Sequence, residues 1–167
     1  GASNTAVGYN ALDANTTAQR NTAVGYDAMG VNTTGDYNTA VGSYALDANT
    51  TGDDNVAVGD ASLSSNTTGL ENTAVGRYAL FSNTTASYNT SLGFKAGYAI
   101  TTGTDNTLVG SYCGMTATTD IGLTGIGKGA LQNSSGGYNT AMGVSALSSI
   151  TGNHNVAIGR NTMGGST

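Results

Sequence analysis

The chain has 167 residues, of which 26 are glycine, none is proline or tryptophan, and only 9% are charged. Asn, Thr, Gly, Ala and Ser dominate it, a composition that leaves a chain disordered unless strict periodicity lets each unit bury its few apolar residues against its neighbours. The net charge of −5, with five basic residues scattered singly, excludes a nucleic-acid binder, and no apolar run approaches the roughly 20 residues of a membrane span.

The chain opens with Gly1, Ala2 and Ser3, which precede the first regular unit. We expect residues 1–3 to be a cloning remnant or the end of a preceding coil, and residues 4–167 to form a single repeat domain. The lone cysteine, Cys113, excludes an internal disulfide framework.

The most regular feature of the repeat is the glycine of N-T-A-V-G. It recurs ten times, first every 17 residues and in the last two steps every 16 residues. These glycines are Gly8, Gly25, Gly42, Gly59, Gly76, Gly93, Gly110, Gly127, Gly143 and Gly159. The consensus unit reads N-T-A-V-G-Y-x-A-L-x-x-N-T-T-G-x-x. This periodicity predicts an all-β chain, a parallel β-roll or β-solenoid of about ten coils of 16–17 residues.

Each unit begins with a short predicted strand, the T-A-V segment before the glycine. The residue next to the glycine is always aliphatic, and the residue two positions earlier is Thr or Val. Because alternate residues of a strand share a face, we expect these two columns to point inward and the alanine column between them to point outward. The alanines are therefore the predicted interchain contact. They are Ala6, Ala23, Ala40, Ala57 and Ala74.

The rest of the unit supplies the other wall of the coil. A Leu or Met stands four residues after most of the glycines and is the predicted opposite wall of the core. The glycine suits a corner with positive φ. The Asn that opens each unit is expected to stack as a hydrogen-bonded ladder along the solenoid, and N-T-T to form a second short strand. A helix is excluded because no window has the i, i+3, i+4, i+7 spacing.

Tyrosines near the glycine are the first candidate ligand surface. They are Tyr9, Tyr26, Tyr44, Tyr78 and Tyr112. An exposed tyrosine row binds sugars by ring stacking and through its hydroxyls. The alternative interpretation is that these rings shield a thin core or fill a seam between chains.

A column of threonines from the N-T-T segments is the second candidate surface. It begins with Thr17, Thr34, Thr51, Thr68 and Thr85. Ranked threonines on a regular β-solenoid are typical of ice-binding proteins. Because the two threonines of each segment are adjacent, only one of each pair faces out.

The pattern predicts no catalytic residue, metal site or cofactor. His154 is the only histidine and falls in a loop column, and Cys113 takes the place of a small alanine. Asp36, Asp53 and Glu71 precede successive strands and would come close in stacked coils. The glycine-rich nonapeptide pattern of calcium-binding rolls is nevertheless absent, so we expect a solvated acidic edge there.

The repeat resembles the head repeats of YadA-type trimeric autotransporter adhesins, whose units read roughly S-V-A-I-G-x-x-S-x-A-x-G. The segments 55–59 (N-V-A-V-G) and 155–159 (N-V-A-I-G) match that core almost residue for residue, although this unit is about three residues longer. Arrays of N-T-A-V-G-Y-x-A-L also look like those of phage tail fibres. The resemblance implies a left-handed parallel β-roll, homotrimeric and extracellular, at a cell surface or on a virion.

Together these features predict a structural and adhesive fibre module, the shaft or head of a trimeric adhesin or tail fibre. We expect a homo-oligomer, trimer or fibre, that attaches to a cell-surface glycan or protein receptor through many weak identical contacts. We expect no enzymatic activity, no cofactor, no nucleic-acid partner and no membrane insertion. The alternative is an ice-binding β-solenoid that uses its threonine columns.

Overall fold

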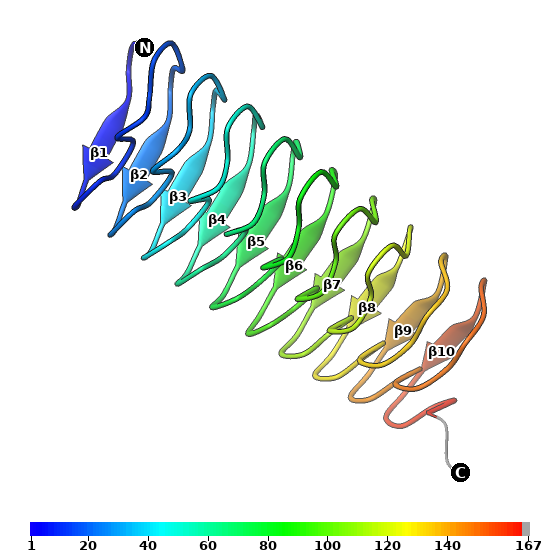
Figure 1. The fold of residues 1–167 in the computed structure, drawn as a ribbon. Coiled ribbons are helices and arrows are strands. Elements are labelled where there is room, and N and C mark those ends of the chain that lie inside the picture. Colours follow the sequence, from blue (N-terminus) through cyan, green and yellow to red (C-terminus); the bar gives the residue numbers. More distant parts are fainter. Residues whose placement is uncertain (165–167) are drawn as a thin grey trace.

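The computed structural model describes residues 1–164, which form one all-β solenoid (Figure 1). Its ten three-residue strands are β1 (Thr5–Val7), β2 (Thr22–Val24), β3 (Thr39–Val41), β4 (Val56–Val58), β5 (Thr73–Val75), β6 (Thr90–Leu92), β7 (Thr107–Val109), β8 (Thr124–Ile126), β9 (Thr140–Met142) and β10 (Val156–Ile158). Coil n denotes strand βn and the residues that follow it up to the next strand. The predicted parallel β-solenoid of about ten coils is confirmed.

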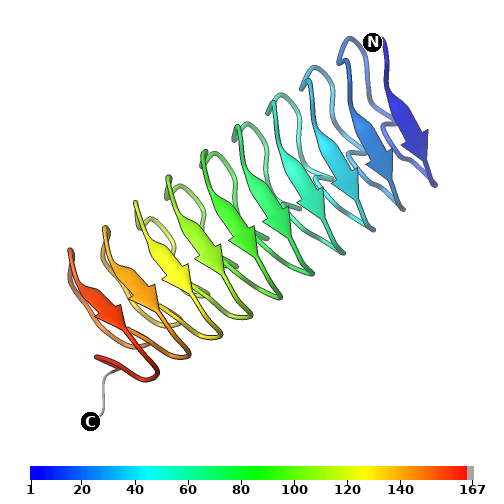
Figure 2. The same cartoon turned by 180° about the vertical axis from the view of Figure 1, so that it is seen from behind.

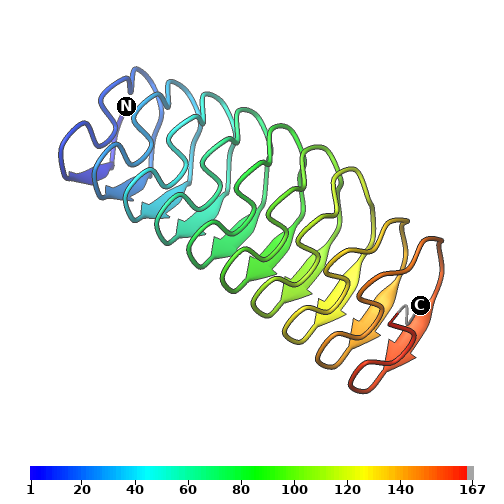
Figure 3. The ribbon, with the colours of Figure 1, turned by 60° about the horizontal axis from the view of Figure 1, so that its bottom comes forward.

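The ten strands form a single parallel sheet in the order β1 to β10. Each strand pairs in register with the next, so that Ala57 lies between Ala40 and Ala74. The strands follow one side of the tube (Figure 2), and turns and loops close each coil on the other side (Figure 3).

The predicted second strand at N-T-T is not formed in coils 1 to 7. The backbone amides of Thr50 and Thr51 both donate to the carbonyl of Thr67, at 3.0 and 3.3 Å. Because both amides share one acceptor, the alternating ladder of a sheet cannot develop there. In this region the described residues contain only an isolated bridge, between Ser135 and Thr151.

The strands face the core with the side opposite to the one predicted. Of the five alanines proposed as an interchain contact, four have 0% of their surface exposed within the single chain, and only Ala6 of the first coil is exposed. The four buried residues are Ala23, Ala40, Ala57 and Ala74. The interior is so thin that the large side chain opposite leaves room for little more than a methyl group. The alanine column is therefore core and not a contact surface, and the Thr and Val columns point outward.

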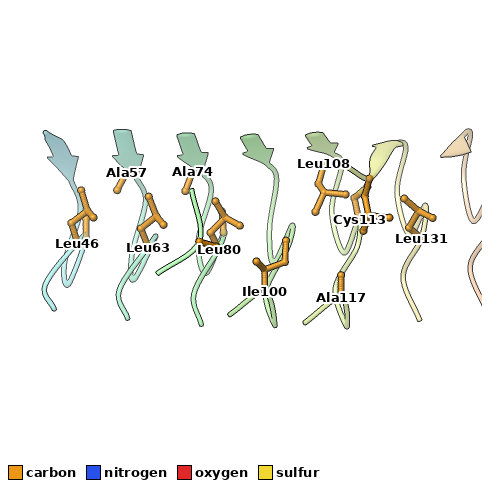
Figure 4. Packing of buried hydrophobic residues seen from close by; sticks show 14 of the residues in the cluster. Leu46, Ala57, Leu63, Ala74, Leu80, Ile100, Leu108, Cys113, Ala117 and Leu131 are labelled. Carbon is orange, nitrogen blue, oxygen red and sulfur yellow. The ribbon is translucent and has the colours of Figure 1, made fainter. Parts of the chain in front are cut away.

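The opposite wall of the core is the predicted Leu and Met column. Leu46, Leu63 and Leu80 are fully buried. Figure 4 shows the Ala57 and Ala74 side chains reaching from their strands toward this column. One large side chain against one methyl group in each coil accounts for the narrow cross-section.

Coils 6 and 7 fill the same core with a different set of residues, and in coil 7 the large and small residues exchange walls. Gly97 and Gly114 stand where other coils have Leu or Met, and Leu108 points inward from β7 where other strands have Ala, Ser or Gly (Figure 4). In coil 6, Ile100 is also fully buried, in a column that is Asn in coils 1 to 5. Strand pairing continues in register through these coils, so the irregular sequence alters the filling of the core and not the stacking.

Buried asparagines form two ladders along the axis. In the predicted ladder, the amide N of Asn38 donates to Asn21 Oδ1 at 2.7 Å and that of Asn55 to Asn38 Oδ1 at 2.9 Å. A second ladder runs through the N-T-T asparagines, where Asn66 Nδ2 donates to Asn49 Oδ1 at 2.9 Å. These bonds satisfy polar groups that the thin core would otherwise leave without partners.

The repeated glycine fits its corner for two reasons. Gly59 has φ +133°, a conformation that side chains strongly disfavour. A Cβ atom there would lie 2.7 Å from the carbonyl carbon of Gly76 in the next coil. Close axial stacking of the coils therefore requires glycine at this position.

Candidate functional site

The outer side of the sheet, here called the strand face, consists of the first and third side chains of β1 to β10. None of them is fully buried. The third positions form an aliphatic file of Val7, Val24, Val41, Val58, Val75, Leu92, Val109, Ile126, Met142 and Ile158. With strands spaced by about 4.8 Å, this file is about 43 Å long. The strand face is thus a continuous apolar strip along the whole solenoid.

A threonine file runs beside the aliphatic one. Its members are Thr5, Thr22, Thr39, Thr73, Thr90, Thr107, Thr124 and Thr140, with Val56 and Val156 completing the column. Within residues 1–164 the hydroxyls of these threonines make no hydrogen bond to the chain. The strand face therefore presents methyl groups and free hydroxyls in parallel rows.

The predicted column of Thr17, Thr34, Thr51, Thr68 and Thr85 is exposed at a corner of the coil. Its neighbours in the sequence do not widen it into a face. On one side the hydroxyls of Thr33, Thr50 and Thr67 donate to backbone carbonyls of the next coil at 3.0–3.1 Å. On the other side stand buried glycine or alanine residues. A ligand-binding role for this single file stays a prediction.

A second surface, here called the aromatic edge, comprises the residues one, two and five positions after each repeated glycine. In coils 1 to 3, Tyr26 stacks on Tyr9, with centroids 5.4 Å apart, and meets Tyr44 edge-on at 5.4 Å. The Asp27 carboxylate raises the pKa of the exposed Tyr26. The predicted tyrosines therefore form a row in these coils, but coil 4 interrupts it with Asp60 and Ala61.

Further along the edge, Tyr78 and Tyr112 belong to a second group. Phe94 lies between them, with centroid distances of 6.5 Å to Tyr78 and 5.3 Å to Tyr112. Phe81, Phe94 and Tyr98, with Lys95, join this group and are not among the predicted residues. Their signal in the sequence is weak because position five after the glycine is not aromatic in the other coils.

Acidic side chains surround an open hollow of about 330 Å³ on coils 1 to 3. Its lining residues are Asn10, Asp13, Asp27, Gly30, Val31 and Asp47. Burial raises the pKa of Asp47. Among residues 1–164, no three His, Cys, Asp or Glu side chains are arranged to hold a metal ion.

The acidic residues before the strands take part in coil stacking. An oxygen of Asp36 accepts from the backbone amide of Gln19 at 2.7 Å, and one of Asp53 accepts from the amide of Asp36 at 2.7 Å. These carboxylates thus connect neighbouring coils.

The two residues most suited to chemistry are far from reactive arrangements. Cys113 is packed in the core as predicted, and burial raises its pKa to about 12, so its nucleophilic thiolate is scarce at neutral pH. His154 is exposed and stacks on Tyr138 with centroids 5.2 Å apart. Within residues 1–164, neither side chain is paired with a second side chain to form a nucleophile and its general base.

No protein-family model, curated protein or solved structure matches this chain. Within the described residues, no helical segment has the length and hydrophobicity needed to cross a bilayer. The strand face and the aromatic edge are two distinct surfaces that run along the outside of the solenoid.

Proposed function

We propose that the chain is a structural and adhesive fibre module, the shaft or head of an attachment fibre at a cell surface or on a virion. The observation that carries this proposal is the unbroken aliphatic file of the strand face, uncovered in all ten coils. A parallel sheet is ordinarily covered on both faces, and a long contiguous apolar surface marks an interaction site. The strand face is therefore the seam through which chains associate.

Further copies of the same chain are the partners that suit this seam best. A partner with the same coil spacing can match every strand along about 43 Å, which a surface of another period cannot do. Closed symmetric assemblies are the usual form of homo-oligomers. The resemblance to YadA-type head repeats and tail-fibre arrays supports three chains, and leaves the aromatic edge for a glycan or protein receptor. The role proposed is attachment without catalysis.

The mass in solution tests this proposal. By light scattering and sedimentation velocity, we expect three times the chain mass of 16.5 kDa. Val75→Asp places a charge on the seam and is expected to release monomers, whereas Thr68→Asp on the exposed corner leaves the mass unchanged. Circular dichroism checks that both variants are folded. A wild-type chain that stays monomeric at high concentration, or a Val75→Asp variant with wild-type mass, contradicts the proposal.

Ice binding is the second candidate, and one observation favours it. The strand face is a regular array in which threonines with free hydroxyls run beside a row of methyl groups. This two-file face suits a lattice better than the single N-T-T corner file. Thermal hysteresis together with inhibition of ice recrystallisation by a monomer, both lost in Val75→Asp, would establish it. Absence of both effects removes this candidate.

A further inference from the structure

The aromatic edge carries a ring cluster in coils 5 to 7 that the other coils lack. Its rings are Tyr78, Phe81, Phe94, Tyr98 and Tyr112. Phe81 and Tyr98 stack with centroids 5.3 Å apart and planes inclined by 5°. Tyr78 meets them edge-on at 5.6 and 6.4 Å. Because each ring is held by another, the cluster is a preorganised and partly exposed aromatic wall.

Shielding of the core does not explain these rings. Coil 4 carries Asp60, Ala61 and Ser64 at the three edge positions, and its core residue Leu63 is still 0% exposed. Leu80, the equivalent residue in coil 5, is equally buried beneath the cluster. The repeat thus buries its core without aromatic cover, and the rings are an addition to the surface.

A cation without a carboxylate partner lies over the wall. Lys95 Nζ is 5.1 Å from the ring centroid of Tyr98, 5.6 Å from that of Phe94 and 5.9 Å from that of Tyr78. Within residues 1–164 the one salt bridge joins Arg77 to Asp60, at 3.0 Å. The rings hold the Lys95 ammonium in place while its charge stays available to an anion.

Charge is also sorted along the aromatic edge. The acidic residues on it all lie in coils 1 to 4, and are Asp13, Asp27, Asp47 and Asp60. The basic residues on it all lie in coils 5 to 10, and are Arg77, Lys95, Lys128 and Arg160. The ring cluster therefore opens the basic half of an otherwise acidic protein.

We infer that this cluster binds an acidic oligosaccharide. The apolar C–H face of a sugar ring stacks on the Phe81–Tyr98 wall, tyrosine hydroxyls bond its hydroxyls, and its carboxylate or sulfate pairs with Lys95. A nucleic-acid strand fits less well as the ligand. Its phosphates require many clustered cations, whereas this protein has a net charge of −5. The inference names a ligand class for the proposed adhesive fibre and rests on that function only for its biological setting.

Matched saccharides test the ligand class. A galacturonic acid trisaccharide is compared with its methyl ester, sialyllactose with lactose, and a heparin-derived oligosaccharide with its desulfated form. Saturation-transfer NMR and calorimetry report binding to the wild-type chain. We expect at least one acidic sugar to bind more tightly than its neutral counterpart, with saturation strongest at C–H groups of the stacked ring.

Variants of the chain test the site. Tyr98→Ala removes one stacking surface and should weaken binding about ten-fold, whereas Tyr88→Ala, at an exposed tyrosine outside the cluster, should not. Lys95→Gln should abolish the preference for the acidic sugar while neutral stacking persists, and Lys128→Gln is its control.

Four results overturn the inference. They are no binding of any acidic sugar, wild-type binding by folded Tyr98→Ala, an acidic preference that survives Lys95→Gln, or tighter binding of a short oligothymidylate. Each sample's mass in solution is measured in parallel, so failure of the sugar site and failure of the fibre proposal are separate outcomes.

Discussion

The exchanged core of coil 7 gives the sharpest test of how these coils pack. Leu108 is fully buried and points inward from β7, where strands of coils 2 to 5 have alanine. Gly114 occupies the position that is leucine in coils 3 to 5. A Cβ on Gly114 would meet Leu108 Cδ1 at 2.7 Å and Cδ2 at 2.9 Å. The two positions therefore share one volume.

Each single change should destabilise the chain. Leu108→Ala opens a cavity and is expected to cost about 2–5 kcal/mol. Gly114→Leu overfills the same space and is expected to cost about 1–3 kcal/mol. The backbone at position 114 does not forbid leucine, because φ is +56° there and +49° at Leu63 in the same column.

The double variant should reverse the sign of the second change. Leu108→Ala with Gly114→Leu recreates the alanine–leucine pair of coils 3 to 5, so adding Gly114→Leu should stabilise the Leu108→Ala background. The expected coupling between the two positions is about 2–3 kcal/mol. Substitutions that act only through the conformational preference of the single residue would have additive effects and could not produce this change of sign.

Urea unfolding and native-state hydrogen exchange measure these effects. Exchange of the Gly114 amide, which donates to the Ala130 carbonyl at 2.9 Å, reports locally if the coils do not unfold together. Val109→Ala, on the outward side of the same strand, is the control and should cost about 1 kcal/mol or less. Additive costs in the double variant, or a larger cost for Val109→Ala than for Leu108→Ala, would refute the inward alanine column.

Three further outcomes follow from the core and the ladders. As pH rises from about 9 toward 12, the free energy of unfolding should fall, because the buried Cys113 thiol stays protonated to about 12 while the unfolded thiol ionises near 9.0. Cys113→Ala should lessen this decline when the two proteins are unfolded in denaturant at about pH 8 and about pH 10. Asn66→Ala should cost about 1–3 kcal/mol for each ladder group left unpaired, against about 0.5 kcal/mol or less for exposed Thr68→Ala, measured by urea unfolding. Gly76→Ala should cost about 2–4 kcal/mol in the same assay and expose nearby amides to exchange, since φ is +129° and a Cβ would lie 2.7 Å from the Gly93 carbonyl.

The fold was predictable because its constraints act along the axis and recur in every unit. Stacked coils require glycine at the close corner and reward an asparagine that bonds to its own counterpart, and both leave strict columns in the sequence. The N-T-T asparagines recur without a break in coils 1 to 5, yet their ladder was not predicted. Each of these asparagines precedes two β-branched threonines, a pattern that also predicts a short strand. Only the acceptor that Thr50 and Thr51 share at Thr67 distinguishes the observed turn from a strand.

The strand orientation was not predictable from alternation alone. Val58 and Ala57 sit on opposite sides of β4, and the usual rule places the larger apolar residue inside. That rule fails here because the interior already holds Leu46 and Leu63, and it has no volume for two large side chains in each coil. The same error placed the proposed interchain contact on five alanines of which four are fully buried within the chain.

The strand face and the aromatic edge are informative about function because their side chains point away from the core and do not have to fit between neighbouring coils. The limited volume of the core restrains the inward columns, so that Leu108 replaces alanine together with a compensating Gly114. Outward columns have no such restraint, so an outward feature that persists needs another cause. The aliphatic file persists through all ten coils, which suits a partner that runs the whole length of the solenoid. The ring cluster around Tyr98 is confined to three coils, which suits a ligand of finite size. The two surfaces thus differ in their extent along the solenoid, as an assembly seam and a binding site would.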